Sequence, residues 1–202
     1  INSEKIIPTT IEFVDIAGLV EGASKGEGLG NQFLSHIRNV DAIIHLVRCY
    51  EDSNITHVAN TLDPLRDIEI IETELLLKDL ESIEKRIPKV AKTAKSGDKD
   101  ALLEVDLLSK IKDKMNNGIL MNKIDLNDSE KNLLAHLSFI TNKPIIYAAN
   151  ISEEDITSNN NSHALKVLEY AKLNDCQFMQ LCGKIEMEIS KLDKKDKIEF
   201  LQ

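Results

Sequence analysis

The sequence predicts an α/β protein in which a mostly parallel sheet is interrupted by an inserted α-helical hairpin. Two observations predict the sheet: short, continuous apolar runs that end in polar loops, and stretches of helical spacing between those runs. Apolar runs of this kind are typical of strands that are buried on both faces of a parallel sheet. A third observation predicts the hairpin, because apolar residues recur mostly three or four positions apart over a long central region.

Four apolar runs are predicted to be strands, and each is followed by a polar or glycine-containing loop. They are Ile11–Val14, Asp41–Arg48, Ile145–Ala149 and Gln177–Leu181. Strands that alternate with helical segments are the pattern of βα units, in which successive strands run parallel.

The region between the second and third predicted strands has helical periodicity. Apolar residues from Ile68 to Ala94 define one face of a long helix, Ser96-Gly97-Asp98 interrupts it, and the same spacing returns from Leu102 to Met115. Pro88 is expected to kink the first helix, because it lacks a backbone donor. Gly118 is expected to end the second helix in a left-handed conformation.

Composition limits the classes of protein to which this chain can belong. The longest apolar runs are far too short to span a bilayer, and no signal peptide is visible, so we expect a cytoplasmic protein without membrane contact. The three widely spaced cysteines form no metal-ligand or disulfide pattern and are expected to be reduced thiols. A net charge of −9 argues against nonspecific wrapping of nucleic acid, but permits a local basic patch.

A DxxG motif, Asp15-Ile16-Ala17-Gly18, stands at the end of the first predicted strand. In nucleotide switches this aspartate holds Mg²⁺, usually through water, and the glycine amide approaches the terminal phosphate because no Cβ obstructs it. The motif alone also fits a strand that ends in an ordinary turn. The glycine-rich sequence that follows, GASKGEGLGNQF, favours a switch loop that changes conformation when a phosphate leaves.

The sequence FVDIAGLVEGASKGEGLGNQFLSHIRNVDAIIHLVRCYED resembles the second-switch region of the Obg-related P-loop NTPases, and within them the YchF subfamily. TLDPLRDIEIIETELLLKDLE, AKSGDKDA and PIIYAANISEED are similar to the same subfamily, so the resemblance covers nearly the whole chain. It implies a partial, G-domain-like P-loop NTPase fold, formed by residues 1–65 and 118–202, with a helical hairpin inserted at 66–117. It also implies ATP-hydrolysing switch activity with Mg²⁺, and association with ribosomes.

Proteins of this kind begin with a GxxxxGKS P-loop and a first switch segment, and they continue into a small C-terminal TGS domain. None of these lies within the sequence. Because the P-loop amides and lysine form most of the triphosphate cradle, we expect this chain alone to bind nucleotide poorly and to be inactive.

Two sequences compete for the role of reading the base. Asn122-Lys123-Ile124-Asp125 matches NKxD, the guanine-reading motif, and follows residues 118–121, which are predicted to form a short strand. Asn150-Ile151-Ser152-Glu153 follows the stronger strand and matches the NxxE sequence that the YchF subfamily carries at this position.

The resemblance implies that Asn150, Ile151 and Glu153 bind the nucleotide, with the backbone of the Cys182-Gly183 loop packed on the base. Such a motif does not offer the usual Asp carboxylate to the N1 and N2 donors of guanine. We therefore expect ATP to be preferred and GTP to bind more weakly.

Catalysis requires a water molecule aimed at the terminal phosphate, often by a Gln directly after DxxG. Leu19 occupies that position and cannot orient water, a substitution that the subfamily shares. His57, in the polar loop after the second predicted strand, is the candidate catalytic residue, although it also fits an ordinary surface histidine.

A row of basic residues recurs at helical spacing on the predicted hairpin. It consists of Lys85, Lys89, Lys92, Lys95 and Lys99. These lysines fit a contact with the phosphates of ribosomal RNA, and they equally fit a solvated helix face supported by pairs such as Glu81 with Lys85.

Three functions therefore remain open at the level of sequence. The first is an ATP-preferring switch NTPase that acts on or near the ribosome. The second is a GTPase that reads guanine through Asn122 and Asp125. The third is a non-catalytic binding module whose helical hairpin docks a partner.

Overall fold

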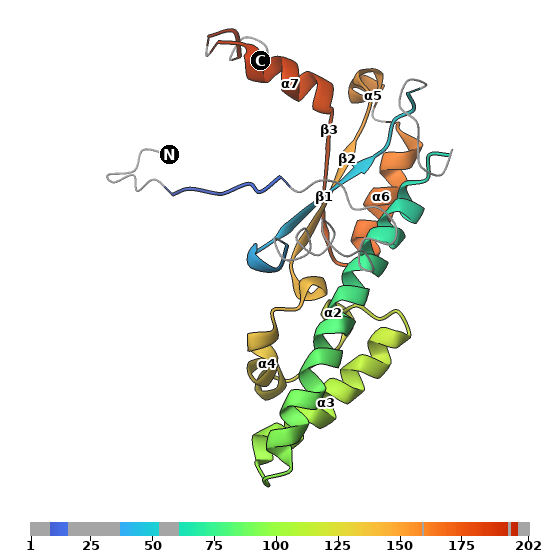
Figure 1. Ribbon diagram of the computed structural model, residues 1–202. Helices are drawn as coiled ribbons and strands as arrows, with labels where there is room; N and C mark the ends of the chain where they lie inside the picture. The colour runs from blue at the N-terminus through green and yellow to red at the C-terminus, as the bar shows by residue number, and fades with distance from the viewer. Residues whose placement is uncertain (1–8, 16–36, 53–60, 159, 194, 198–202) are drawn as a thin grey trace.

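The computed structural model describes residues 9–15, 37–52, 61–158, 160–193 and 195–197. In this part of the chain, β1 (Ile43–Arg48), β2 (Ile145–Asn150) and β3 (Gln177–Leu181) form one sheet in the order β1-β2-β3. Both strand pairs are parallel (Figure 1). The predicted α/β class with a parallel sheet is therefore confirmed.

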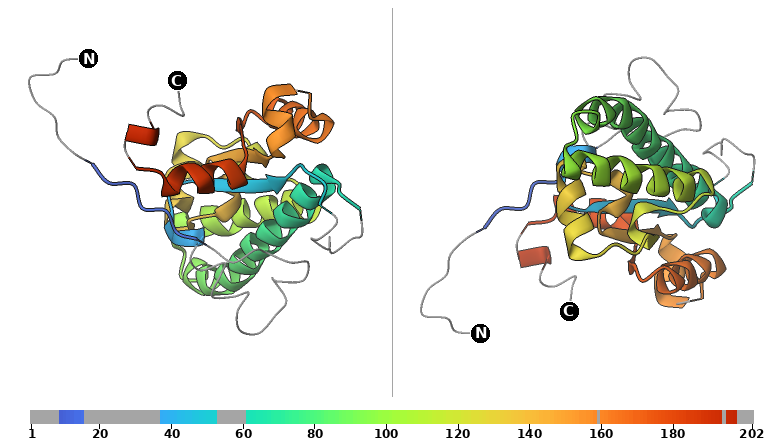
Figure 2. Two further views of the ribbon diagram at one scale, coloured as in Figure 1. Left: turned by 90° about the horizontal axis from the view of Figure 1, so that it is seen from above. Right: turned by 90° about the horizontal axis from the view of Figure 1, so that it is seen from below.

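The prediction of a strand at Ile11–Val14 was wrong. Residues 9–15 form neither helix nor strand, and they run away from the rest of the molecule in every view (Figures 1 and 2). Ile11 and Phe13 are 78% and 76% exposed. An apolar run forms a strand only beside a neighbour that completes its hydrogen-bond ladder, and no described strand lies next to this segment.

One face of the sheet is covered by two helices, α2 (Pro64–Ala94) and α6 (Ser162–Leu173). Val47 and Tyr147 of the strands pack with Ile68 of α2 and Val167 of α6 in one buried cluster. Both Tyr147 and Tyr170 donate their hydroxyls to the Glu72 carboxylate, at 2.5 and 2.8 Å. This contact joins the sheet to both helices.

The opposite face of the sheet is apolar and partly open. Leu46, Ala148 and Met179 are ladder partners across the three strands, and Leu46 and Met179 are 58% and 43% exposed. The continuous apolar runs in the sequence thus reflect an apolar surface on both faces, of which the described residues bury one.

The predicted helical hairpin is confirmed. α2 and α3 (Lys99–Asn116) lie side by side in all views (Figures 1 and 2). Their facing sides form a core that contains Leu80, Ile83, Leu108 and Ile111. The turn between the helices depends on Gly97, whose φ of +86° disfavours residues with a side chain.

α2 is a single helix of 31 residues that continues through Pro88, so this proline does not end it. Ile68, near its start, packs with the sheet, whereas its second half packs on α3. The boundary between the α/β part and the hairpin, at residues 65–66 and 117–118, stays a prediction, because α2 belongs to both cores.

The chain returns from the hairpin to the sheet through short helices. Gly118 ends α3 in the predicted left-handed conformation, with φ +82°. The predicted strand at 118–121 was wrong: Met121–Lys123 form a 3-10 turn, η1, in which Met121 is buried in the hairpin core. Leu120 packs against the same core, and no strand of the described residues pairs with this segment.

α4 (Asp128–Leu134) begins at a capping box, in which Asn127 and Glu130 satisfy each other's backbone donors. It ends at Leu134, and the chain then turns twice more, at η2 (Ala135–Leu137) and η3 (Ile140–Asn142).

A buried carboxylate fixes this second turn. Asp79 of α2 accepts hydrogen bonds from the backbone N–H groups of Ile140 and Thr141, at 2.9 and 2.8 Å, and from the Thr141 hydroxyl at 2.8 Å. Asp79 is fully buried. Burial raises the pKa of its carboxyl, and these hydrogen bonds oppose that shift.

Two further helices follow strands of the sheet. α5 (Glu153–Ser158) follows β2, and α7 (Gly183–Lys191) follows β3. None of the described helices is both long enough and apolar enough to cross a lipid bilayer.

Candidate functional site

The carboxyl ends of the three strands meet at one edge of the sheet. Arg48, Asn150 and Leu181 are in register. Beyond them, the Cys49 N–H donates to the carbonyl of Asn150 at 2.8 Å, and the Ile151 N–H donates to the carbonyl of Leu181 at 2.9 Å. In open parallel α/β sheets, ligands bind outside the carboxyl ends of the strands. This edge is therefore the candidate functional site.

Asn150 occupies the centre of this edge and has a fixed side-chain orientation. Its Oδ1 accepts the backbone N–H of Gly183 at 3.0 Å. Gly183 is the first residue of α7, where helix N–H groups lack partners within the helix. Because the side-chain oxygen is occupied, the Nδ2 amide is the group that remains to donate to a ligand.

Glu153 is the first residue of α5, and its carboxylate accepts the Lys184 ammonium at 2.8 Å. Both side chains are more than half exposed. The predicted site residues Asn150, Glu153 and Gly183 are thus brought together on the loops that follow β2 and β3.

Ile151 and Cys182 belong to the same edge but are buried, at 3% and 5% exposure. Ile151 packs in the sheet core, and Cys182 lies at the N-terminal boundary of α7. Any contact that they make with a nucleotide would involve their backbone, in line with the predicted packing of this loop on a base.

Two residues that sequence reasoning missed brace the loop after β2. Asn161 Nδ2 donates to the carbonyl of Cys49 and to Asp155 Oδ2, both at 2.7 Å, and the Ser152 hydroxyl lies 2.7 Å from the same Asp155 oxygen. Hydrogen bonds from Ser152 and Asn161 lower the pKa of the Asp155 carboxyl. The available signal was Asn161 directly before a helical pattern, the usual place of an N-cap, and its Oδ1 does accept the Ala164 N–H.

Asp15, the predicted Mg²⁺ ligand, is exposed in the segment 9–15. Within the described residues it makes no hydrogen bond or ion pair with the group around Asn150, so the predicted metal ligand is not joined to the predicted base site there. Gly18 and His57, the predicted phosphate-binding and catalytic residues, lie outside the described residues.

The competing motif lies at the other end of the sheet. Asn122 and Lys123 belong to η1, and Lys123 Nζ donates to the carbonyl of Asn174 at 2.7 Å. Asn174 precedes the start of β3 at Gln177, whereas Asn150 pairs with Leu181 at its end. The four residue steps from Gln177 to Leu181 correspond to about 13 Å along β3. The two motifs therefore lie at opposite ends of the sheet.

Burial controls the ionisation of two groups on β1 and at its end. The pKa of His45 is lowered to about 4 by burial, and its ring contacts that of Tyr147 with centroids 5.6 Å apart. The pKa of the Cys49 thiol is raised to about 12, mainly by burial. All three cysteines are free thiols, as predicted.

Two cavities, of about 660 and 350 Å³, lie beside the hairpin and at its base. Neither is lined by a residue of the Asn150 group.

Comparison with known proteins agrees with this geometry. Residues 1–79 match the family model described as 50S ribosome-binding GTPase. The chain is 46% identical over its whole length to the ribosome-binding ATPase YchF of Bacillus subtilis, and 45% identical to that of Escherichia coli O157:H7. It covers 56% and 55% of those proteins, so it spans about half the length of the curated relatives that it matches.

The fold has a match among solved structures. The YchF GTPase of Schizosaccharomyces pombe superposes with a TM-score of 0.74 at 33% identity, over 91% of this chain and 50% of that one. The chain belongs to the YchF family. Its sheet and helices are accordingly part of a P-loop NTPase fold, as the sequence predicted. The names of YchF proteins divide between ATPase and GTPase, so they leave the preferred nucleotide open.

Proposed function

We propose that the protein containing this chain is a Mg²⁺-dependent switch NTPase that hydrolyses ATP in preference to GTP and associates with ribosomes in the cytoplasm. The observation that carries the proposal is the position of Asn150, at the carboxyl end of the central strand with its side chain held by Gly183. A purine presents N7 as an acceptor, and the free amide of Asn150 is a suitable donor to it.

The surroundings of Asn150 favour adenine over guanine. Guanine requires an acceptor for its N1 and N2 hydrogens, a role for which NKxD motifs supply an Asp carboxylate. In this chain the nearby carboxylate belongs to Glu153, and it already accepts the Lys184 ammonium. A guanine would have to share this carboxylate with Lys184, whereas an adenine has no N1 and N2 hydrogens that need it.

Asn122 and Asp125 are poorly placed to read guanine, although their letters match NKxD. They lie at the amino end of the strands, where η1 closes the base of the hairpin. A GTPase that depends on these residues is therefore the weaker alternative.

The remaining roles fall to residues at the margins of the described chain. Asp15 fits a Mg²⁺ ligand, because Mg²⁺ is commonly bound through one or two carboxylates, waters and substrate phosphates. No group of three or more potential metal ligands occurs in the described ranges. A bound Mg²⁺ would neutralise charge on the terminal phosphates. Gly18 would contact the terminal phosphate, and His57 would assist the attacking water.

Ribosome association is supported by the relatives, which are named ribosome-binding ATPases. The basic row Lys85, Lys89, Lys92, Lys95 and Lys99 is the candidate contact with RNA, and all five lysines are exposed. The hairpin would then be the part of the molecule that reaches the partner. A purely structural binding module is the other candidate, and the same contact would serve it.

Calorimetric titration of a full-length protein with ATP and GTP tests the proposal. We expect tighter binding of ATP, and Glu153→Asp should shift the preference toward GTP. Asp125→Ala is the matched control and should change neither affinity. Tighter binding of GTP, abolished by Asp125→Ala, would establish the alternative. The 202-residue chain titrated beside it should bind either nucleotide poorly.

A further inference from the structure

The side-chain amide of Asn161 joins three segments at the carboxyl edge of the sheet. Its Nδ2 donates to the carbonyl of Cys49, directly after β1, and to Asp155 Oδ2 on α5, both at 2.7 Å. Its Oδ1 accepts the Ala164 N–H of α6 at 2.8 Å. An asparagine amide has two hydrogens to donate and one oxygen that accepts. Both hydrogens and the oxygen are engaged here, so neither a carboxylate nor a hydroxyl could make the same set of bonds.

α5 has little besides polar contacts to hold it in place. None of its six residues is buried, and isolated helices of this length are marginal in water. Its position therefore depends on the bonds of its first turn. The Asp155 carboxylate accepts from Asn161 and lies 2.7 Å from the Ser152 hydroxyl. Glu153 pairs with Lys184 at 2.8 Å.

The bonds of Asn161 also reach the ends of two strands. The Cys49 N–H donates to the carbonyl of Asn150 at 2.8 Å, and the Cys49 carbonyl accepts from Asn161. Cys49 is fully buried, so this part of the backbone has a fixed position. A continuous chain of contacts therefore links five residues: Asn150, Cys49, Asn161, Asp155 and Ser152. Because Ser152 lies two residues after Asn150, these contacts close around the loop that we assigned to the base.

Capping of α6 is the ordinary role of an asparagine at this position. The capping bond uses only the oxygen of the amide. The two N–H groups donate to segments outside α6, and capping requires neither of these bonds. An aspartate caps a helix about as well as an asparagine, but it has no N–H to donate. A single substitution can therefore separate the two roles of Asn161.

We propose that Asn161 is a positioning residue of the nucleotide site, which holds α5 and Glu153 in place relative to Asn150 and so maintains the selectivity for adenine. This inference rests on the proposed function, to which it adds a residue that acts through others. With α5 held, the Glu153 carboxylate stays with Lys184 beside the base. When α5 is released, adenine loses the contacts that depend on a fixed loop, whereas GTP, which this loop does not favour, loses less.

Calorimetric titration of full-length variants with ATP and GTP tests this role. Asn161→Asp retains the cap of α6, removes both N–H donors and places a second carboxylate beside Asp155. We expect ATP affinity to fall about tenfold and GTP affinity to change by less than about twofold. Unchanged ATP affinity in this variant would overturn the proposal, and so would an equal loss of affinity for both nucleotides.

Exchange of the donor and the acceptor separates positioning from a general disturbance. In the double variant Asn161→Asp with Asp155→Asn, the amide lies on α5 and the carboxylate on α6, so the link between the two helices returns in reverse. We expect its ATP affinity to lie within about threefold of the wild type. A double variant that binds ATP no better than Asn161→Asp alone would show that the link is not the cause.

A milder pair of variants decides the question if Asn161→Asp alters the fold, which thermal unfolding reports. Asp155→Ala removes the acceptor on α5 and leaves the cap of α6 intact. Glu154→Ala removes an equal charge from the neighbouring, exposed position of the same helix. The first should weaken ATP binding about fivefold, and the second should leave it unchanged. Equal effects would assign the result to charge alone and overturn the proposal.

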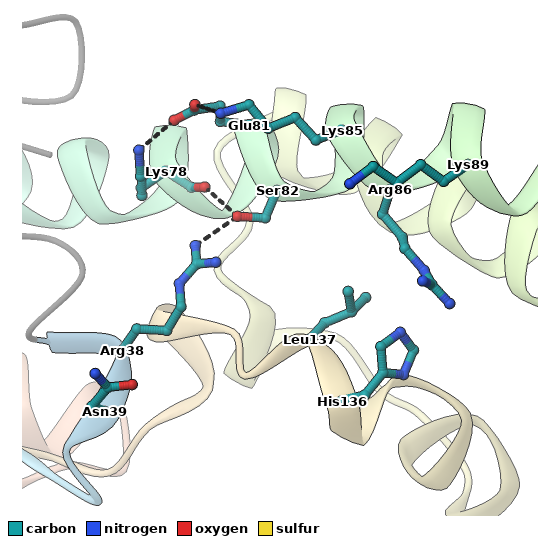
Figure 3. A pocket seen from close by; sticks show the side chains of 10 residues that line it. All are labelled: Arg38, Asn39, Lys78, Glu81, Ser82, Lys85, Arg86, Lys89, His136 and Leu137. Carbon is teal, nitrogen blue, oxygen red and sulfur yellow. Dashed lines mark hydrogen bonds and ion pairs between the residues drawn. The ribbon is translucent and has the colours of Figure 1, made fainter. Parts of the chain in front are cut away.

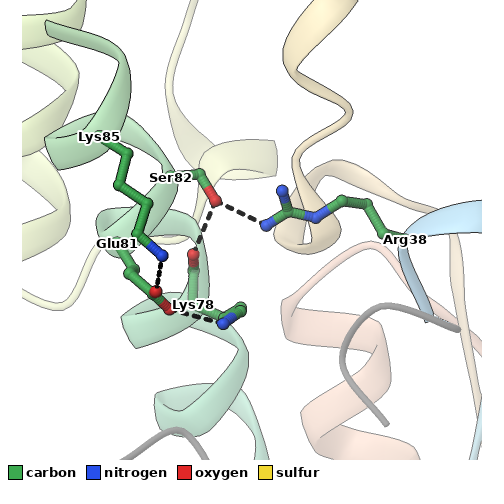
Figure 4. A network of polar contacts seen from close by, with 5 residues as sticks. All are labelled: Arg38, Lys78, Glu81, Ser82 and Lys85. Carbon is green, nitrogen blue, oxygen red and sulfur yellow. Dashed lines mark hydrogen bonds and ion pairs between the residues drawn. The ribbon is translucent and has the colours of Figure 1, made fainter. Parts of the chain in front are cut away.

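A side-chain bond far from this edge provides the distant control. Arg38 Nη2 donates to the Ser82 hydroxyl of α2 at 2.6 Å, beside the larger cavity (Figure 3). The same hydroxyl donates to the carbonyl of Lys78 at 3.0 Å (Figure 4). Ser82→Ala removes these bonds and should leave the affinities for ATP and GTP unchanged. Loss of the ATP preference in Ser82→Ala would overturn a role specific to Asn161.

The wild type separates this inference from the proposed function. If it binds GTP more tightly than ATP, the proposed adenine preference falls. The positioning role is then decided by GTP, which Asn161→Asp should bind more weakly and the double variant should bind again. A full-length protein that binds neither nucleotide would overturn both proposals.

Discussion

The two ends of the sheet carry similar motifs that are held in different ways. At the amino end, Asn122 and Lys123 lie in a 3-10 turn that anchors the base of the hairpin. At the carboxyl end, Asn150 terminates the central strand and holds the first N–H of α7. The comparison teaches that the letters of a short motif do not locate a site, because the position of the motif relative to the strands decides what it can reach.

A buried carboxylate at the amino end should show the largest effect on stability. Asp79→Ala would leave the N–H groups of Ile140 and Thr141 and the Thr141 hydroxyl without their acceptor. We expect the free energy of unfolding to fall by about 4 kcal/mol, measured by urea denaturation. Asp106→Ala, which removes an exposed partner of Lys110 on α3, is the control and should leave the free energy of unfolding close to that of the wild type. A similar loss in both variants would show that this end is not held by Asp79.

The comparison itself is tested by removing the asparagine at each end. Asn150→Ala should weaken ATP binding by the full-length protein about 100-fold, or about 2.7 kcal/mol, because the base loses its donor and Gly183 loses its acceptor. Asn122→Ala should leave ATP affinity within about twofold of the wild type. Calorimetry gives both values. A larger loss of ATP affinity in Asn122→Ala than in Asn150→Ala would show that the amino end of the sheet binds the base.

The ion pair between the helices of the hairpin should matter more than the exposed pair beside it. Arg86→Met would leave the Glu104 side chain, 7% exposed, with only His136 at 3.4 Å. We expect a loss of about 2 kcal/mol, below the usual cost for a fully buried pair, because Arg86 is one-third exposed. Lys85→Met removes a partner of Glu81 whose own side chain is 69% exposed, and should cost about 0.3 kcal/mol. Thermal or urea unfolding measures both losses. Equal losses of unfolding free energy in the two variants would contradict a larger contribution from the pair between Arg86 and Glu104.

The pH dependence of stability should report His45 on β1. Its folded pKa of about 4 lies below the ordinary value of 6.5, so the unfolded chain takes up the proton first as the pH falls. Stability is therefore unaffected above about pH 6.5 and decreases between 6.5 and 4, by about 1–2 kcal/mol at pH 5. Urea denaturation at pH 7.5 and pH 5 measures this difference. His45→Gln should lack that component, and an identical pH profile in the variant would assign the effect to other groups.

Much of the fold could be predicted because it depends on local pattern. The period of the apolar residues identified the two hairpin helices, and Gly118 marked the end of the second, which the structure confirms. The strand predictions failed where the apolar pattern is local but the neighbouring strand needed for pairing is not. Ile11–Val14 and residues 118–121 have the composition of strands, yet no described neighbour completes their ladders.

The residues of the candidate site also fall into those that the sequence predicts and those that it does not. Asn150, Glu153 and Gly183 were found because strand ends and family motifs mark them in the sequence. Asn161 and Asp155 were missed, since their bonds to Ser152 and to the end of β1 follow from a loop conformation that no spacing reveals. Arg38 was missed because its bond to the Ser82 hydroxyl of α2 joins residues 44 positions apart in the chain.

The sequence by itself determined the α/β class, the inserted hairpin and the family, because periodicity and long motifs are properties of the chain alone. Tertiary structure decided that Asn150, rather than Asn122, stands at the carboxyl edge of the sheet. It also decided which lysines line the same cavity as Arg38. Both depend on residues far apart in the chain, which only packing brings within hydrogen-bond distance.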